Sequence, residues 1–281
     1  MEIFILILSS FISLLSPIGF VSDKLAENAI RSQFKKVEQV DVRIDNAPLG
    51  NIASGKVDRL RVATRGLFPL EGIRIEAVEL ETDPINVSFA DLRKNKLVLQ
   101  EPLGVGLKLV IRGEDVIQAL KSPLVTKQIQ KLLDSLGGGL RLKELQPEQA
   151  KQLEQIQQLR NRLEKYRVLN PKFEFLGDQR FSLEVEVEDL ETSDRLKLAI
   201  TSGFELSENK RITLIQPVVT VNGAPLPDPL VEVLKQFLAD QLDLQKLEAY
   251  LKIQARVLKF SLDKGQLELV TFIRLPAGFR I

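Results

Sequence analysis

The residues best placed to do chemistry are three glutamates at alternate positions. Glu184, Glu186 and Glu188 lie in the segment LEVEVEDLETSD, residues 183–194. In an extended strand, alternate residues project from one face about 7 Å apart, a spacing that suits a calcium site or an acid–base pair. The intervening positions are Leu, Val and Val. This alternation is typical of a half-buried strand, so we interpret the glutamates as its solvated face.

The composition removes most other chemistry. The chain has no His, Cys or Trp, which excludes His-containing triads, thiol nucleophiles, Cys/His zinc sites and disulfides. The segment PLGVGL (102–107) resembles a phosphate loop but lacks the following Lys-Ser/Thr. We therefore predict no enzyme, no metal and no cofactor. With 39 basic and 38 acidic residues, the chain lacks the basic excess of nucleic-acid binders, so we predict no nucleic-acid partner.

The N-terminal region is strongly apolar. Residues 3–22, IFILILSSFISLLSPIGFVS, carry no charge, and about 20 such residues span a bilayer as a helix. Glu2 precedes the run and no small-x-small cleavage site follows it. We predict a membrane anchor or signal-like segment over residues 1–22, with a helix buried in the fold as the alternative. By the positive-inside rule the domain would be cytoplasmic, because the nearby cations all follow the run: Lys24, Arg31, Lys35 and Lys36.

The rest of the chain predicts an α+β fold with an antiparallel sheet. A helical stripe over residues 22–37 precedes four strand segments, and a second group of four strands follows later. No crossover helix separates neighbouring strands, which favours hairpin connections. Two helices and a hairpin turning at Asp263-Lys264-Gly265 close the chain. The expected strands are 38–44, 57–67, 73–89, two short strands within 96–113 on either side of Pro102-Leu103-Gly104, 168–175, 180–190, 195–206 and 211–221. A Gln-rich helix is expected over 146–165.

The strand at residues 73–89, IRIEAVELETDPINVSF, changes its apolar parity twice. A one-residue slip turns a strand's apolar face outward. We predict a bulge near Ala77-Val78 and a second break at Pro84. In this interpretation one bent strand continues from Ile73 to Phe89 around an apolar groove.

The connection RGLFPLEG (65–72) concentrates three apolar residues in a short segment: Leu67, Phe68 and Leu70. Exposed apolar tips of this kind enter membranes. We predict that these residues contact a membrane, and the alternative is that they fold back onto the core.

Several segments, taken in order, resemble the LmeA-like phospholipid-binding family and in particular its cyanobacterial-type branch. The resemblance is carried by VDRLRVATRGL (57–67), by IRIEAVELETDPINVSF (73–89), by LVLQEPLGVGLKLVIRGEDVIQAL (97–120), and by QPVVTVNGAPLPDPLVEVLKQFLADQLDLQKL (216–247). The Gln-rich 146–165 helix departs from the family pattern as an insertion. The resemblance implies a fold similar to tubular lipid-binding (TULIP) domains, with a curved antiparallel sheet wrapped around long helices. It also implies phospholipid binding outside the cytoplasmic membrane, against the charge pattern above.

We therefore expect one lipid-binding α+β domain over residues 23–281. It would be membrane-associated, on the periplasmic or exoplasmic side, and would serve envelope lipid transport or maturation. The alternative is a non-enzymatic assembly factor with a filled core that binds a protein partner, which the sequence does not identify. The predicted acyl-chain contacts are Leu60, Val62, Ile73, Ile75, Ile85, Val87 and Phe89 from the sheet, and Val116, Ile117 and Leu120 from a helix.

Overall fold

The computed structural model describes residues 7, 10, 23–45, 55–92, 96, 98–125, 127–128, 166–189, 193 and 195–279. These residues form two compact units. The first comprises residues 1–111, 244–261 and 267–281, and the second comprises residues 112–243 and 262–266. The chain runs from the first unit into the second and then returns, and the single domain expected over residues 23–281 stays a prediction. The predicted Gln-rich helix, and all of the predicted anchor except Ile7 and Ser10, lie outside the described residues.

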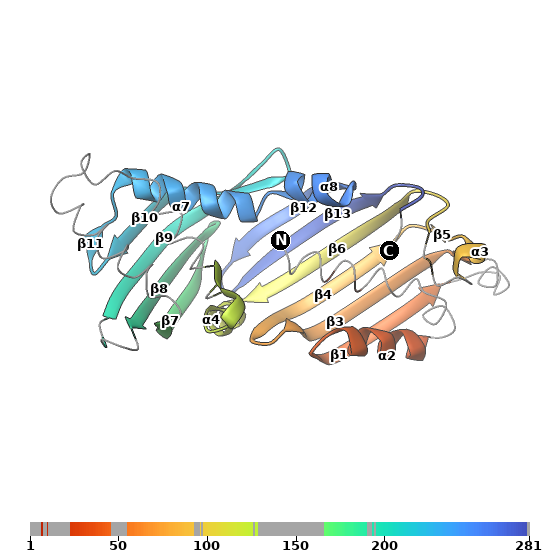
Figure 1. Ribbon diagram of the computed structural model, residues 1–281, viewed down its shortest axis with the longest axis horizontal. Coiled ribbons are helices and arrows are strands. Elements are labelled where there is room, and N and C mark those ends of the chain that lie inside the picture. The colour runs from red at the N-terminus through yellow and green to blue at the C-terminus, as the bar shows by residue number, and fades with distance from the viewer. Residues whose placement is uncertain are drawn as a thin grey trace. The chain divides into compact units, whose positions relative to one another are not determined.

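The first unit is built on a six-stranded sheet in the order β1-β3-β4-β6-β13-β12 (Figure 1). Its strands are β1 (Lys36–Asp45), β3 (Arg59–Leu70), β4 (Ile73–Thr82), β6 (Leu103–Arg112), β12 (Gln254–Asp263) and β13 (Gln266–Leu275). The pairs β1–β3, β3–β4 and β4–β6 are antiparallel. A separate pair joins β2 (Lys56–Val57) to β5 (Ile85–Asn86). The helices of this unit are α2 (Asp23–Gln33), α3 (Phe89–Leu92) and α8 (Leu244–Leu251).

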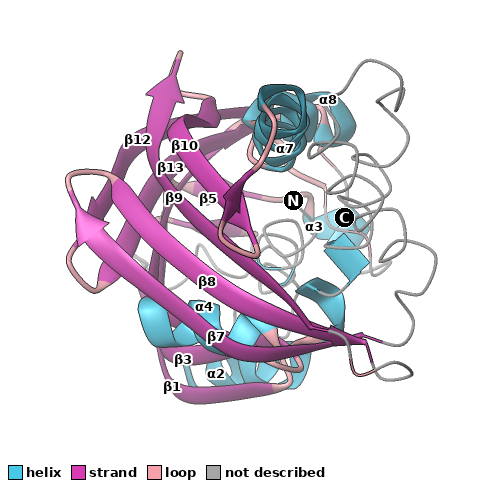
Figure 2. Ribbon diagram, turned by 90° about the vertical axis from the view of Figure 1, so that its left-hand side faces the viewer, coloured by secondary structure: helices cyan, strands magenta, loops and turns pink. Residues whose placement is uncertain are grey.

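The second unit contains a five-stranded antiparallel sheet in the order β11-β10-β9-β8-β7 (Figure 1), of which Figure 2 labels β7 to β10. Its strands are β7 (Tyr166–Gly177), β8 (Arg180–Asp189), β9 (Arg195–Ser207), β10 (Arg211–Val221) and β11 (Ala224–Pro225). Helix α4 (Gly113–Leu120) packs on β7, and α7 (Asp228–Gln241) packs on β10. Leu230 and Leu234, one helical turn apart, are the buried residues of α7.

The α+β class and the antiparallel sheets agree with the sequence prediction. Both sheets are curved, and over the described strands neither closes on itself. The long central helices of the predicted fold are not confirmed, because the longest helix among the described residues is the 14-residue α7.

Helix α2 is held along β1 by its apolar stripe and by a hydrogen bond near each end. Ala26 and Ile30 are its buried residues. The Ile44 amide donates to the Asp23 carboxylate at 3.2 Å, and the Arg31 guanidinium donates to the Val37 carbonyl at 2.8 Å. These contacts orient the helix so that Ile30 enters the core of the first unit.

The parity change predicted in β4 is present, but its cause differs from the predicted bulge. Ile73, Ile75 and Ala77 are buried on one parity, and Val78, Leu80 and Thr82 on the other. Pairing of β4 with β6 is unbroken from Ala77 to Thr82, so no bulge lies at Ala77-Val78. Both faces of β4 are covered at this level, because Ala77 and Val78 are each fully buried.

The same parity change occurs in the neighbouring strands. Val37 pairs with Leu67, which pairs with Ile75, while Val42 pairs with Val62, which pairs with Leu80. All six are buried, yet the two rows have opposite parity, so the switch lies between them on all three strands. It is a property of the sheet rather than of one strand.

The predicted continuation of one strand from Ile73 to Phe89 is wrong. Strand β4 ends at Thr82, and Ile85 and Asn86 form β5 of a different sheet. The amide of Asp83 still donates to the Gly104 carbonyl at 2.9 Å. Pro84 follows and has no amide hydrogen to continue the ladder, so the chain leaves the large sheet there.

Gly66 is the residue of β3 at which the parity changes, because Gly66 and Leu67 are both buried. Its φ of +57° is a left-handed conformation that is costly for residues with a Cβ atom. The Glu38 side chain lies where a Cβ on Gly66 would project. Arg74 binds Glu38 at 3.3 Å and Glu76 at 2.9 Å. A glycine at position 66 therefore permits the left-handed backbone conformation. It also leaves room for the Glu38 side chain, which Arg74 binds.

The substitution Gly66→Ala should lower the free energy of unfolding by about 1–2 kcal/mol, because it adds a Cβ atom to a left-handed residue. Denaturant unfolding followed by circular dichroism measures the change. The matched control is Gly106→Ala in β6, where the nearest atom to the new Cβ would be the Glu81 carbonyl oxygen at 3.7 Å. Alanine costs less conformational entropy than glycine in a strand, so the control should be neutral or slightly stabilising. Equal losses for both variants would contradict the assigned role of Gly66.

Candidate functional site

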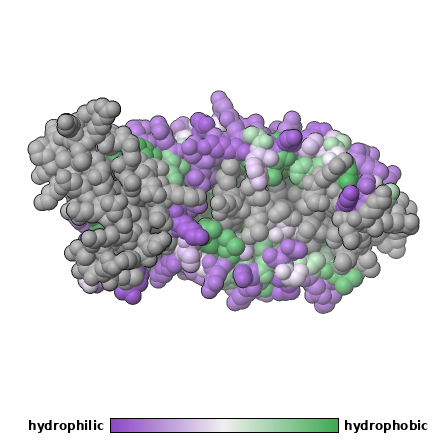
Figure 3. Space-filling view, in the orientation of Figure 1, coloured by the Kyte–Doolittle hydropathy of each residue, from purple (hydrophilic) through white to green (hydrophobic). Residues whose placement is uncertain are grey.

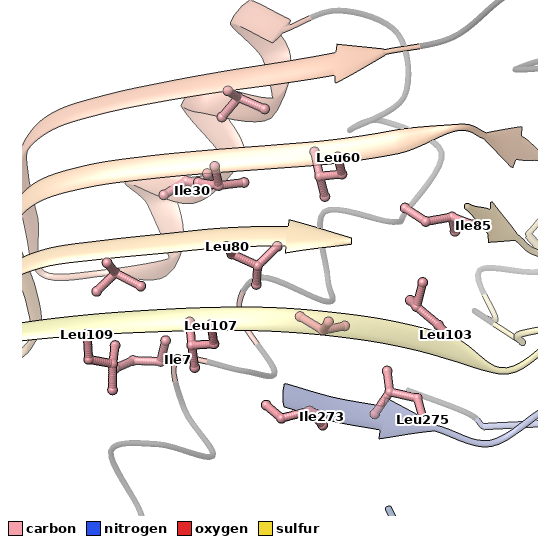
Figure 4. Packing of buried hydrophobic residues seen from close by; sticks show 14 of the residues in the cluster. Ile7, Ile30, Leu60, Leu80, Ile85, Leu103, Leu107, Leu109, Ile273 and Leu275 are labelled. Carbon is pink, nitrogen blue, oxygen red and sulfur yellow. The ribbon is translucent and has the colours of Figure 1, made fainter. Parts of the chain in front are cut away.

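An aliphatic face on the six-stranded sheet is the most extensive feature of the first unit. Cross-strand pairing places Val62, Leu80 and Leu107 in one row, and Thr64, Val78 and Leu109 in the next. In the close view, side chains from β3, β4, β6 and β13 extend from the same side of the sheet (Figure 4). The labelled residues of this group are Leu60, Leu80, Leu103, Leu107, Leu109, Ile273 and Leu275. We call this surface the aliphatic face.

Three buried threonines in these strands form hydrogen bonds between their hydroxyl groups and the backbone of neighbouring strands. Thr64 donates to the Val78 carbonyl at 3.3 Å, and Thr82 accepts from the Leu60 amide at 3.1 Å. Thr271 donates to the Leu107 carbonyl at 3.4 Å. Buried hydroxyls require such partners. With their oxygens bonded to the backbone, these threonines add methyl groups to the apolar surface without demanding a polar ligand.

The opposite side of the same strands is charged. Arg61 contacts Asp45 at 2.8 Å and Glu81 at 3.6 Å, and Lys108 contacts Glu79 at 3.4 Å. A shallow cavity of about 420 Å³ lies among these residues. Their side chains are 31–55% exposed, so each pair contributes at most about 1 kcal/mol. This side is a solvated surface. On the face of the molecule that Figure 3 presents, which is not assigned to this charged side, patches of hydrophobic residues are bordered by hydrophilic ones.

The predicted acyl-chain contacts fall into three groups. Leu60 and Val62 lie in β3 with the parity of the aliphatic face. Ile73 and Ile75 are buried on the other parity of β4, and Ile85 and Val87 are buried at and after β5. Phe89 begins α3, and its side chain lies outside the described residues.

The predicted helical contacts belong to the other unit. Val116, Ile117 and Leu120 lie in α4, where all three are half-buried and the helix packs on β7. The structure therefore assigns them to the second unit, and the strand residues to the first. Their role as lipid contacts stays a prediction.

Sequence reasoning missed part of the aliphatic face. Leu80, Leu107, Leu109, Ile273 and Leu275 were absent from the predicted contacts. The signal was present in β6, where Val105, Leu107 and Leu109 alternate. The interpretation of residues 96–113 as two short strands obscured this alternation. The pairing of β6 with β4 shows that these residues share a face with Leu80.

The predicted membrane-contact residues end β3 rather than forming an exposed loop. Leu67 is fully buried, while Phe68 and Leu70 are half-buried. The Lys36 ammonium lies 5.2 Å from the centre of the Phe68 ring. Leu67 is therefore packed within the fold, and its contact with a membrane stays a prediction. Membrane contact by Phe68 and Leu70 stays a prediction.

The glutamates of β8 are bound in ion pairs and hydrogen bonds. Glu188 accepts from Arg167 at 2.7 Å and from Arg195 at 3.0 Å. These two guanidinium groups hold the pKa of Glu188 below its ordinary value. Glu184 lies 3.6 Å from Lys172 and 3.8 Å from Lys197, and Glu186 accepts from Asn170 at 3.3 Å. Their partners come from the flanking strands β7 and β9, as expected for cross-strand pairing.

A second ion pair ties the end of α7 to β10. Asp243 is 2% exposed and accepts two hydrogen bonds from Arg211, at 2.8 and 3.1 Å. This carboxylate raises the pKa of Arg211. The Ile212 amide also donates to the Leu242 carbonyl at 3.4 Å. Because a buried carboxylate needs a paired cation, Arg211 fixes the point where the chain leaves the second unit.

No group of three or more carboxylates within the described ranges could hold a metal ion. No helix in the same part of the chain is both long and apolar enough to cross a bilayer. The described surfaces therefore offer apolar burial and paired charges.

Comparison with known proteins identifies the family. The family model described as LmeA-like phospholipid-binding matches residues 15–272. The chain belongs to this family. The match covers both units and nearly all of the described residues. The family description names binding rather than catalysis. No curated protein and no solved structure matched the chain.

The Arg167–Glu188–Arg195 cluster should make stability fall in acid. Since folding lowers the pKa of Glu188, its contribution is present above the unfolded-state pKa of about 4.3. It is lost as pH falls through the lower folded-state value. The variant Glu188→Gln should therefore be less stable than the parent at pH 7, and the difference should narrow towards pH 3. Urea unfolding at several pH values measures this.

The control is Glu232→Gln on α7, a carboxylate whose side chain is 60% exposed. It should leave the acid dependence close to that of the parent protein. A stability difference between Glu188→Gln and the parent that stays constant from pH 7 to pH 3 would rule out the assigned role.

Proposed function

We propose that this protein binds a phospholipid through its acyl chains, and that the aliphatic face of the first unit is the contact surface. The observation that carries the proposal is the continuous set of Leu, Ile and Val side chains on β3, β4, β6 and β13. Membership of the LmeA-like phospholipid-binding family supports the lipid class. Leu60 and Val62, expected from the sequence, and Leu80 and Leu107, found from the register, are the first contacts to test.

Binding would rest on the hydrophobic effect. Burial of apolar surface contributes roughly 25 cal/mol per Å² and has no directional requirement. A surface of branched aliphatic side chains can therefore bind hydrocarbon tails without distinguishing one tail from another. The threonine hydroxyls bonded to the backbone are consistent with such a ligand, because none is left to demand a polar partner.

The proposal includes association with a membrane on the periplasmic or exoplasmic side and a role in envelope lipid transport or maturation. The uncharged run at residues 3–22 supports membrane association. The basic residues after this run argue for the opposite side. Reporter fusions to the C-terminus, read in each compartment of a bacterial host, would discriminate the two.

Protein purified in mild conditions should carry a phospholipid. Native mass spectrometry should show one or two bound lipids per chain, and solvent extraction followed by lipid mass spectrometry should identify them. A folded sample that neither carries lipid nor takes up added phospholipid would contradict the proposal. That result would favour the alternative of an assembly factor with a filled core.

Two adjacent residues of β6 provide a matched pair of variants. Leu107 is buried on the aliphatic face, whereas Lys108 projects to the charged side. Leu107→Thr should weaken lipid binding by about tenfold, because it replaces apolar contact with a buried hydroxyl. Lys108→Thr should change affinity by less than about twofold, the outcome expected of a side chain that does not touch the ligand.

Displacement of a fluorescent lipid analogue measures both variants, and circular dichroism checks that each remains folded. Equal effects from the two variants would mean that the ligand does not lie on the aliphatic face.

A further inference from the structure

A cavity of about 410 Å³ lies at one end of the six-stranded sheet, where β6 and β12 begin and β13 ends. Its described lining comes from the residue before β6, from the start of β12 and from the end of β13. All of these residues belong to the first unit. The volume lies in the range of roughly 300–1,000 Å³ that is usual for small-molecule sites. We call it the sheet-end cavity.

The described lining of the sheet-end cavity carries positive charge without a carboxylate. Lys252 and Arg274 are its charged residues, and both are exposed. Neither has an ion-pair partner among the residues that the structure describes. By contrast, three acidic and three basic residues line the cavity on the charged side of the sheet. The sheet-end cavity is therefore suited to an anion, because an anion would supply the opposite charge that the lining lacks.

The backbone of Lys252 is fixed on both sides. Its φ of +55° is left-handed, the conformation that commonly ends a helix and that glycine usually supplies. The Ile253 amide donates to the Glu248 carbonyl of α8 at 3.3 Å, and the Ala255 amide donates to the Glu248 carboxylate at 2.7 Å. Ile253 itself is 5% exposed. These contacts hold the lysine at the cavity, so that only its side chain has to adapt to a ligand.

The sheet-end cavity adjoins the aliphatic face. Three of its lining residues are each followed directly in sequence by a member of the buried cluster: Pro102 by Leu103, Lys252 by Ile253, and Arg274 by Leu275. Leu103 and Leu275 lie on the neighbouring strands β6 and β13 (Figure 4). An amphiphile whose tails lie on the aliphatic face can therefore place its polar end at the cavity.

We propose that the sheet-end cavity binds the phosphate group of the lipid whose acyl chains lie on the aliphatic face. Arg274 donates paired hydrogen bonds to two phosphate oxygens, the geometry to which a guanidinium is suited. Lys252 supplies a second positive charge. The inference rests on the proposed lipid binding and specifies the polar end of the ligand.

Two lipids that differ only in the phosphate group isolate its contribution. Dihexanoyl phosphatidic acid and dihexanoylglycerol have the same tails, and both are used as monomers in calorimetric titrations of the full-length chain. The parent should bind the phosphatidic acid about tenfold more tightly, the lower end of what charged hydrogen bonds contribute. This preference should narrow as salt is raised from about 0.05 to about 0.5 M, because both cations are exposed.

The double variant Lys252→Gly/Arg274→Gln tests the two cations. Glycine adopts the left-handed conformation at position 252 without strain, so the end of α8 is retained while the charge is removed. The affinity for dihexanoyl phosphatidic acid should fall to that for dihexanoylglycerol, and the affinity for dihexanoylglycerol should stay unchanged. The matched control is Arg65→Gln in β3, the same change at an exposed residue outside the described lining. It should keep the tenfold preference.

Inorganic phosphate distinguishes a lipid headgroup from a free phosphate ion as the occupant. It should compete with dihexanoyl phosphatidic acid only at concentrations about 100-fold above those of the lipid, because it gains no apolar burial. It should not displace dihexanoylglycerol. Binding of inorganic phosphate as tight as that of the lipid would make the cavity a site for a free ion and overturn the inference.

The remaining outcomes separate this inference from the proposed function. Equal affinity of the parent for the two lipids, or a preference that survives in the double variant, would overturn the inference alone. Loss of dihexanoylglycerol binding in the double variant would assign the two residues a structural role and would also overturn it. Failure of the parent to bind either lipid would overturn the inference together with the proposed function.

Discussion

The strict alternation of side chains along antiparallel strands in fixed register is the constraint on which the first unit depends. Leu107 and Lys108 are neighbours in β6, yet one is buried with Leu80 and the other pairs with Glu79 on the opposite side. A slip of one residue would exchange the two sides. The aliphatic face and the charged face are therefore two consequences of one hydrogen-bonding pattern.

The row of Glu38, Gly66 and Glu76 shows how the sheet departs from this alternation without losing register. In β1, β3 and β4 the buried residues have one parity at Val37, Leu67 and Ile75 and the opposite parity at Val42, Val62 and Leu80. The number of residues between these paired positions is the same on all three strands. Gly66 provides the left-handed backbone, and Arg74 binds the two glutamates that flank it. Cross-strand ion pairs of this kind add little stability when exposed, but here the cluster occupies the space that a side chain at Gly66 would need.

Two carboxylates of the second unit are held by guanidinium groups. Glu188 is bound by Arg167 and Arg195, and buried Asp243 is bound by Arg211. These carboxylates are occupied by guanidinium groups from the same unit. This is consistent with a family described by what it binds, and with a binding surface built from aliphatic side chains.

The sequence by itself determined the α+β class, the antiparallel strands, the closing hairpin and the absence of His and Cys chemistry. These follow from local periodicity, turn residues and composition, which act over a few residues. It also predicted Leu60 and Val62 as sheet residues that contact acyl chains; both are buried in β3, and their contact with lipid stays a prediction. The end of β4 at Thr82, the shared parity change at Gly66 and the joining of Leu80 with Leu107 were decided by pairing between distant segments. The position of Ile7 in the core was decided in the same way, because only the fold brings this residue into one cluster with Leu60, Leu80 and Leu107.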